Sequence, residues 1–244
     1  MSNKQKIHIG TSGWNYNHWS GPFYPKDLPQ KKWLEFYRER FHTVEINNSF
    51  YQLPKASTFE TWRTTVPSDF RFAVKASRYI THMKKLKQPA EAVSNFMNRI
   101  ESLGDKADVV LFQLPPKWKF NGDRLRSFFN LLPDTFRYTF EFRDSTWWND
   151  ETFEILNEHN AAFCIFELAG KKTPTQVTTD FIYIRLHGPG AAYEGSYGDN
   201  TLSQWAEQFS EWQDQGKEIY CYFDNDQNGY AAQNALKLQE LVHS

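Results

Sequence analysis

The sequence predicts a single (β/α)8 TIM barrel over residues 1–244, with a reduced sixth helix. Eight runs typical of β-strands alternate with seven runs of helical spacing, and such alternation indicates parallel strands joined by right-handed crossovers. Eight such units fit within about 250 residues. A doubly wound open sheet is the alternative, but the chain lacks the G-x-G-x-x-G turn that would favour a dinucleotide fold.

The expected strands separate apolar from polar side chains. In the run 181–188, Ile182 and Ile184 lie on one face, while Arg185 and His187 lie on the other. The run 108–113 is apolar on both faces, as in a parallel strand that is buried on both sides. The expected strands are residues 6–10, 43–47, 71–75, 108–113, 137–143, 161–167, 181–188 and 218–223.

Helices are expected where apolar residues recur at helical spacing. Capping patterns at 57–60 and 201–204 predict the starts of two of them. No helical pattern follows residues 161–167, so the sixth helix is expected to be reduced or lost. The apolar stripes cover residues 33–41, 59–66, 93–100, 125–132, 153–156, 202–212 and 235–241.

Composition narrows the choice of partners and compartment. A formal net charge of −1 gives no overall attraction to nucleic acid or to an anionic membrane, so nucleic acid is a possible partner that the net charge does not support. No apolar run is long enough to span a bilayer, and residues 1–6 lack the apolar core of a signal peptide. Cys164 and Cys221 lie in apolar strand-like runs without zinc-motif spacing, which indicates buried thiols in a cytoplasmic protein.

Polar residues gather at the carboxyl ends of the expected strands, which form the functional face of a TIM barrel. This pattern predicts a functional pocket. Alternatively, these groups pair only with one another and have a structural role. A buried ion pair is often no more stable than its apolar replacement, however, so a purely structural core would do better with apolar residues. The strand-end residues are Thr11 or Ser12, Glu45, Asn47, Lys75, Gln113, Glu141, Arg143, Glu167, Arg185, His187 and Asn225.

The same residues lie in seven motifs that follow one another along the chain. They are Gly-Thr-Ser-Gly-Trp at 10–14, Glu-Ile-Asn-Asn-Ser-Phe-Tyr at 45–51, Lys75 with Thr81-His82, Gln-Leu-Pro-Pro at 113–116, Glu-Phe-Arg at 141–143, Tyr-Ile-Arg-Leu-His-Gly at 183–188 and Tyr-Phe-Asp-Asn-Asp at 222–226. In these motifs the chain resembles the YecE-like family (domain of unknown function 72) over essentially its whole length. The resemblance implies a TIM barrel and supplies no activity.

The candidate catalytic residues are Glu45, Lys75, Glu141 and His187. Paired carboxylates act as acid and base in glycosidases, and a histidine exchanges protons near neutral pH. Lys75 could form a Schiff base, or a salt bridge to Glu45 or Glu141. His187 could instead be a hydrogen-bonded residue without a catalytic role.

The candidate binding residues would hold a small, anionic ligand. Lys75, Arg143 and Arg185 could clamp a carboxylate or phosphate, and loop aromatics could stack on a sugar or base or close the rim. The glycine-containing loop 188–200 is a candidate lid. The predicted binding residues are Thr11, Trp14, Asn47, Tyr51, Gln113, Arg143, Trp147, Arg185 and Asn225.

Three functions remain open from the sequence. The first is an enzyme performing acid/base chemistry, as a hydrolase, lyase or isomerase, without an organic cofactor. The second is a binding protein for a nucleotide, a nucleic-acid end or a metabolite. The third is a metal-dependent phosphodiesterase, with Glu45, His82, Glu141 and His187 as candidate ligands; no H-x-x-x-H or paired Asp motif supports it, and the nearby cations would repel a metal ion.

Overall fold

The computed structural model describes residues 7–243, so the expectations for residues 1–6 lie outside the described part. The strands are β1 Ile7–Thr11, β2 Thr43–Ile46, β3 Arg71–Lys75, β4 Ala107–Leu114, β5 Arg137–Phe142, β6 Ala162–Leu168, β7 Lys171–Lys172, β8 Phe181–Leu186 and β9 Glu218–Phe223. The α-helices are α1 Trp33–Tyr37, α2 Ala56–Thr65, α3 Ala90–Ile100, α4 Gly122–Phe129, α5 Asp150–Glu158, α6 Asp199–Asp214 and α7 Tyr230–Val242.

The strand order confirms the predicted fold class. The sheet runs β1-β9-β8-β6-β5-β4-β3-β2, and a parallel bridge between Ser12 and Glu45 joins the two ends of that order. The two-residue β7 is antiparallel to its neighbour β6, whereas the pairs β1–β9, β8–β9, β3–β4, β4–β5 and β5–β6 are parallel. The described segment between Leu168 and Phe181 contains β7 and no helix, which confirms the loss of the sixth helix. This is a (β/α)8 TIM-barrel fold.

The chain divides into two compact units, and the division passes through β2 and β6. Unit 1 comprises residues 1–45, 165–173 and 180–244, and unit 2 comprises residues 46–164 and 174–179. That the chain forms one domain stays a prediction.

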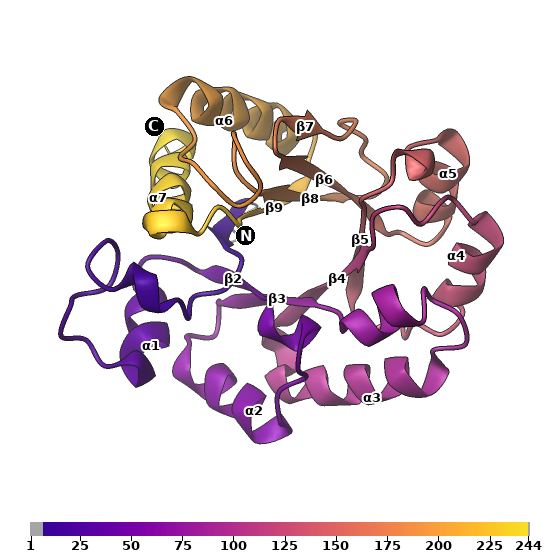
Figure 1. Cartoon of the computed structure of the whole chain (residues 1–244), viewed down its shortest axis with the longest axis horizontal. Coiled ribbons are helices and arrows are strands. Elements are labelled where there is room, and N and C mark those ends of the chain that lie inside the picture. The colour runs from indigo at the N-terminus through magenta and orange to yellow at the C-terminus, as the bar shows by residue number, and fades with distance from the viewer. Residues whose placement is uncertain (1–6, 244) are drawn as a thin grey trace. The chain divides into compact units, whose positions relative to one another are not determined.

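In unit 1, β1, β9 and β8 form a parallel sheet. Helices α6 and α7 pack against each other and next to β9 (Figure 1). A Cβ at Gly10 would lie 2.4 Å from the carbonyl oxygen of Thr43, so only glycine permits this close approach of β1 to β2. The approach sets Ser12 beside Glu45.

In unit 2, β3, β4 and β5 are parallel, and α2, α3 and α4 lie on one side of them (Figure 1). The rings of Phe112 and Phe140 pack against Phe128 of α4, with centroids 5.0 and 6.2 Å away. Because successive side chains of a strand point to opposite faces, Gln113 and Glu141 lie on the face away from α4. This alternation positions the polar groups of unit 2.

Both predicted capping patterns are wrong. Helix α2 begins at Ala56 after Lys55, and α6 begins at Asp199 after Gly198; no side chain of the described residues caps either helix. Asn121 and Asn149 are the capping residues of α4 and α5, each accepting a backbone N–H bond at 2.9 Å.

Two further observations concern the helices and the cysteines. No helix among residues 7–243 is both long and apolar enough to cross a membrane. Cys164 and Cys221 are buried thiols.

Candidate functional site

The predicted site residues divide between the two units. Unit 1 holds Thr11, Trp14, Glu45, Arg185, His187 and Asn225, and unit 2 holds Asn47, Tyr51, Lys75, Gln113, Glu141, Arg143 and Trp147. Each unit brings part of its set together. That the two sets line one pocket stays a prediction.

Arg185 is the centre of a buried network in unit 1. Its Nε and Nη2 donate to the carboxylate oxygens of Glu45 at 2.7–3.1 Å, and Nη2 also donates to Asp224 Oδ2 at 3.1 Å. The side chains of Arg185 and Glu45 are both 0% exposed. The planar guanidinium suits this two-pronged pairing. We call Ser12, Glu45, Tyr183, Arg185, His187 and Asp224 the Arg185 network.

His187 lies between Asp224 and Arg185 and is fully buried. Its Nδ1 is 2.9 Å from Asp224 Oδ2, and its Nε2 is 3.3 Å from Arg185 Nη1. Because a guanidinium can only donate, Nε2 accepts this bond, and Nδ1 donates its hydrogen to Asp224. The basic nitrogen of a neutral imidazole is therefore already engaged. His187 could act as a general base only if its bond to Arg185 opened.

Ser12 and Tyr183 complete the network around Glu45. Ser12 Oγ donates to Glu45 Oε1 and accepts from Arg185 Nη2, while Tyr183 Oη donates to Glu45 Oε2 at 2.7 Å. Burial, followed by the charge of Glu45, raises the pKa of Tyr183 well above its usual value. Tyr183 therefore remains a hydrogen-bond donor at neutral pH.

The prediction from sequence missed Tyr183 and Asp224. Tyr183 lies two residues before Arg185 and therefore on the same face of the strand, so the sequence pattern could have identified it. Asp224 directly follows β9, where the alternation of a strand no longer determines which of two adjacent residues faces a neighbour. The predicted residue at this end was the next one, Asn225.

The other predicted residues of unit 1 bond to its loops. Thr11 Oγ1 is 2.9 Å from Tyr37 Oη, and the buried Trp14 accepts a bond from Tyr24 through its carbonyl. Asn225 Nδ2 donates to Gly195 O at 2.8 Å. The loop 188–200 is thereby tied to the end of β9, and its role as a lid stays a prediction.

In unit 2, Lys75 ends β3 and is 7% exposed. Its ammonium lies 4.3 Å from the centroid of the Phe50 ring, a cation–π contact. Ser49 Oγ donates to the backbone carbonyl of Lys75 at 2.6 Å, which fixes the end of the strand. The cation is thus held in a largely buried position.

Glu141 and Arg143 form an ion pair at the end of β5. Arg143 Nε donates to Glu141 Oε1, and the two side chains are 8% and 0% exposed. Cys164 Sγ lies 3.9 Å from Glu141 Oε2. Glu141 is the register partner of Gln113 on the neighbouring parallel strand, and such strands lie about 4.8 Å apart.

His82 lies on a π-helical turn, Tyr79–Met83, of a kind often found at functional sites. Its Nδ1 is 2.9 Å from Thr81 Oγ1. Burial, followed by the charges of Lys75, Arg78 and Arg143, lowers the pKa of His82 to about 4, with Glu141 opposing them. The imidazole is therefore neutral at pH 7.

Gln113 contributes a buried acceptor. Its Oε1 has no hydrogen-bond partner among the described residues, and the residue is 9% exposed. We call Lys75, His82, Gln113, Glu141 and Arg143 the Lys75 cluster. His82 was predicted only as a possible metal ligand; its position among cations follows from the turn after β3, which the sequence pattern did not indicate.

The remaining predicted residues of unit 2 differ in exposure. Asn47 is half-buried, directly after β2. Tyr51 is 74% exposed, so its ring is available for stacking. Trp147 is fully buried, stacks on Phe142 and donates its indole N–H to Trp118 O at 2.6 Å. A binding role for these residues stays a prediction.

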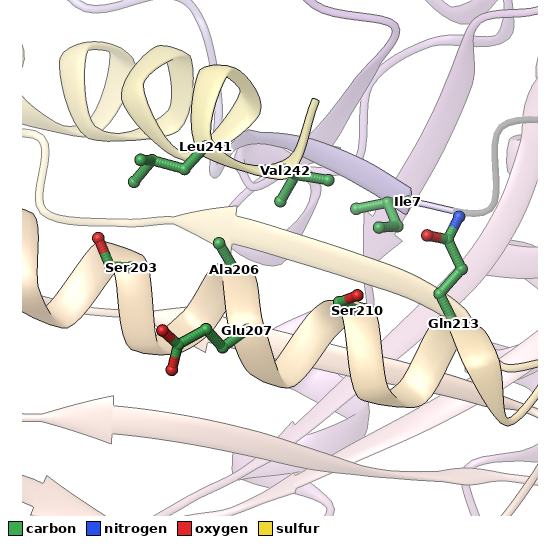
Figure 2. Close-up of a pocket in the computed structure, with 8 residues that line it drawn as sticks. All are labelled: Ile7, Ser203, Ala206, Glu207, Ser210, Gln213, Leu241 and Val242. Atoms are coloured by element: carbon green, nitrogen blue, oxygen red, sulfur yellow. The ribbon is translucent and has the colours of Figure 1, made fainter. Parts of the chain in front are cut away.

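Among residues 7–243 no three or more His, Cys, Asp or Glu side chains are grouped so that they could hold a metal ion. A hollow of about 360 Å³ lies between α6 and α7, beside Ile7 (Figure 2). Of the described residues that line it, Glu207 alone is charged, so it offers no cation to an anionic ligand.

A family model and one relative match nearly the whole chain, and a second relative matches about half of it. A model of the family described as "Protein of unknown function DUF72" matches residues 8–244. UPF0759 protein YunF of Bacillus subtilis (strain 168) is 28% identical over 270 residues, which covers 97% of this chain and 94% of YunF. UPF0759 protein YecE of Escherichia coli (strain K12) is 30% identical over 141 residues, 56% of this chain and 48% of YecE.

Solved structures agree with the fold. A DUF72 family protein from Thermotoga maritima MSB8 superposes with a TM-score of 0.89 at 30% identity, covering 98% of this chain and 99% of that one. A DUF72 family protein from Enterococcus faecalis V583 has a TM-score of 0.82 at 18% identity, covering 98% and 96% of the two chains. At this lower identity the likeness concerns the fold alone.

Proposed function

The chain belongs to the DUF72 family of proteins of unknown function, and from this starting point we propose that it is an enzyme performing acid/base chemistry on a small anionic or sugar-like molecule. The Lys75 cluster is the proposed site. It combines buried cations, a carboxylate and a neutral imidazole at the ends of parallel strands, where TIM barrels carry their active sites.

The charge balance around His82 is the observation that carries this proposal. Lys75, Arg78 and Arg143 act on the imidazole, against the single carboxylate of Glu141. An excess of cations at a largely buried position favours an anion, because the low local dielectric strengthens the attraction. An anionic ligand would offset the charges that keep His82 neutral.

Ligand binding would prepare His82 for proton transfer. An anion beside Lys75 and Arg143 stabilises the imidazolium, so the pKa of His82 would rise from about 4 toward neutrality. A group whose pKa lies near the working pH is the most effective acid or base. Glu141 supplies a second proton carrier and, through its bond to Arg143, orients that guanidinium.

Binding without turnover is the second candidate function. The bond from Arg143 Nε to Glu141 Oε1 favours it, because a carboxylate committed to an ion pair is a weaker base. In that case the Lys75 cluster would hold the anion and leave it unchanged.

Titration with inorganic phosphate and sulfate tests the anion site. We expect binding by calorimetry, together with a rise in the pKa of His82 followed by NMR. Lys75→Met should weaken binding about tenfold, the loss of one charged contact. Lys119→Met, at an exposed position of the same unit, is the matched control. An unchanged His82 titration at saturating anion would contradict the proposed site.

Turnover is tested on the organic anions that bind. Each is incubated in deuterium oxide, and conversion or exchange of its C–H hydrogens is followed by proton NMR. Glu141→Gln should retain the fold, alter ligand binding and abolish the reaction. If every bound anion remains unchanged with the unmodified protein, the protein is a binding protein.

A further inference from the structure

We infer that the ligand of the Lys75 cluster carries a hydroxyl group near its anionic group, and that Gln113 recognises this hydroxyl. The inference rests on the proposed function and specifies its substrate class: a hydroxy acid, a sugar acid or a sugar phosphate. Gln113 has a buried amide oxygen with no hydrogen-bond partner among residues 7–243.

The position of Gln113 requires a partner from outside the described chain. Its strand neighbour Phe112 packs against α4, so the amide lies on the opposite face of β4. Leaving a buried polar atom without a hydrogen bond is unfavourable. A donor that reaches this oxygen from a ligand or a water molecule would remove the penalty.

Gln113 lies between the charged groups of the cluster. On one side, its register partner is Glu141, which binds Arg143. On the other side, Lys75 pairs with Leu111, two residues before Gln113 on the same face of β4. With strands about 4.8 Å apart and a rise of about 3.3 Å per residue, the backbone of Gln113 lies roughly 5 Å from that of Glu141 and roughly 8 Å from that of Lys75. One small molecule can therefore contact both a cation and the amide.

The surrounding groups indicate which kind of donor could bond to Gln113 Oε1. A carboxylate or phosphate oxygen only accepts, so it suits Lys75 and Arg143 but cannot satisfy Gln113 Oε1. An ammonium group could donate, yet the excess of cations around His82 disfavours it. A hydroxyl is uncharged and both donates to and accepts from an amide. The geometry thus points to a hydroxylated anion.

The test compares pairs of anions that share a charged group and chain length but differ in hydroxyls. Glycerate is compared with propionate, and glycerol 3-phosphate with propyl phosphate, by calorimetry on the full chain. In at least one pair the hydroxylated member should bind about tenfold more tightly, as expected for one well-made hydrogen bond. Gln113→Met should remove most of that preference, so that the two members of the pair bind with similar affinity.

The outcomes separate the two proposals. If no member of either pair binds, the proposed anion site is wrong, and this inference fails with it. If both members of each pair bind equally, the anion site stands, a water molecule serves Gln113, and the inference is overturned. A preference that persists in Gln113→Met also overturns it. Should Gln113→Met not fold, Gln113→Asn, which withdraws the amide by one methylene, is expected to reduce the same preference.

Discussion

Replacing Glu45 with glutamine should severely destabilise the protein. The two carboxylate oxygens accept bonds from Ser12, Tyr183 and two nitrogens of Arg185. An amide nitrogen in place of Oε1 would face the donors Ser12 Oγ and Arg185 Nη2. In place of Oε2 it would face the donors Tyr183 Oη and Arg185 Nε. Either orientation leaves buried donors facing a donor, so no rotation of the amide restores the network.

The magnitude follows from the burial of this ion pair. Breaking a buried pair by removing one partner costs about 3–5 kcal/mol, because the other charge remains buried. For a chain of this size each kcal/mol lowers the melting temperature by about 2–4 °C, so a decrease of roughly 6–20 °C is expected. A loss of about 3–5 kcal/mol is a large share of a typical total stability of about 5–15 kcal/mol.

Urea unfolding followed by tryptophan fluorescence and circular dichroism measures the loss. The matched control is Glu39→Gln, whose side chain is 65% exposed and pairs with Arg40; its effect should be below about 1 kcal/mol. If Glu45→Gln costs no more than the control, the Arg185 network does not stabilise the fold through its buried ion pair, and the reasoning is refuted.

Three further predictions concern pH, the core and the loop 188–200. The folded-state pKa of His82 is lowered to about 4, so the unfolded chain binds the proton first, and stability is lost as pH falls from about 6.5 to about 4. The maximum of about 3 kcal/mol falls to roughly 1–2 kcal/mol because the ring is only partly buried, and urea melts of His82→Gln should show a flatter acid slope than the unmodified protein. Ile184→Ala should cost about 2–5 kcal/mol through lost core packing, whereas Glu141→Gln should retain the fold in the same thermal melts; a larger loss for Glu141→Gln would make its role a structural ion pair. Asn234→Ala removes the side-chain bonds to Tyr197 N and Asn225, so hydrogen exchange should accelerate in the loop 188–200 and not elsewhere; unchanged exchange there would contradict this anchoring role.

The sequence predicted the elements more fully than their contacts. Alternating apolar patterns located the strands and the missing helix, because burial imposes a local period on each element. The helix starts were misplaced because the capping pattern also occurs inside a first turn, as in α2 after Lys55. Bonds such as that from Tyr183 to Glu45 join residues 138 positions apart, so they depend on strand register and not on local pattern.

The strand ends were predictable as a group, but their individual partners were not. Arg185 and Glu141 both follow the expected alternation. Yet Arg185 binds two carboxylates of unit 1, and Glu141 binds Arg143, which directly follows its own strand. Which charged groups form a pair depends on how far each side chain extends toward its neighbours in the folded protein. The sequence pattern does not contain this information.

The segment that replaces the sixth helix gives protein engineers a place to attach a reporter. There β6 turns back into β7 through Ala169 and Gly170, both in the left-handed region, and Lys171 and Lys172 are exposed. Exposed turns of this kind tolerate insertions because few packed contacts cross them. A fluorescent label or affinity tag placed at this hairpin would leave Glu45, Arg185 and the Lys75 cluster unaltered in sequence.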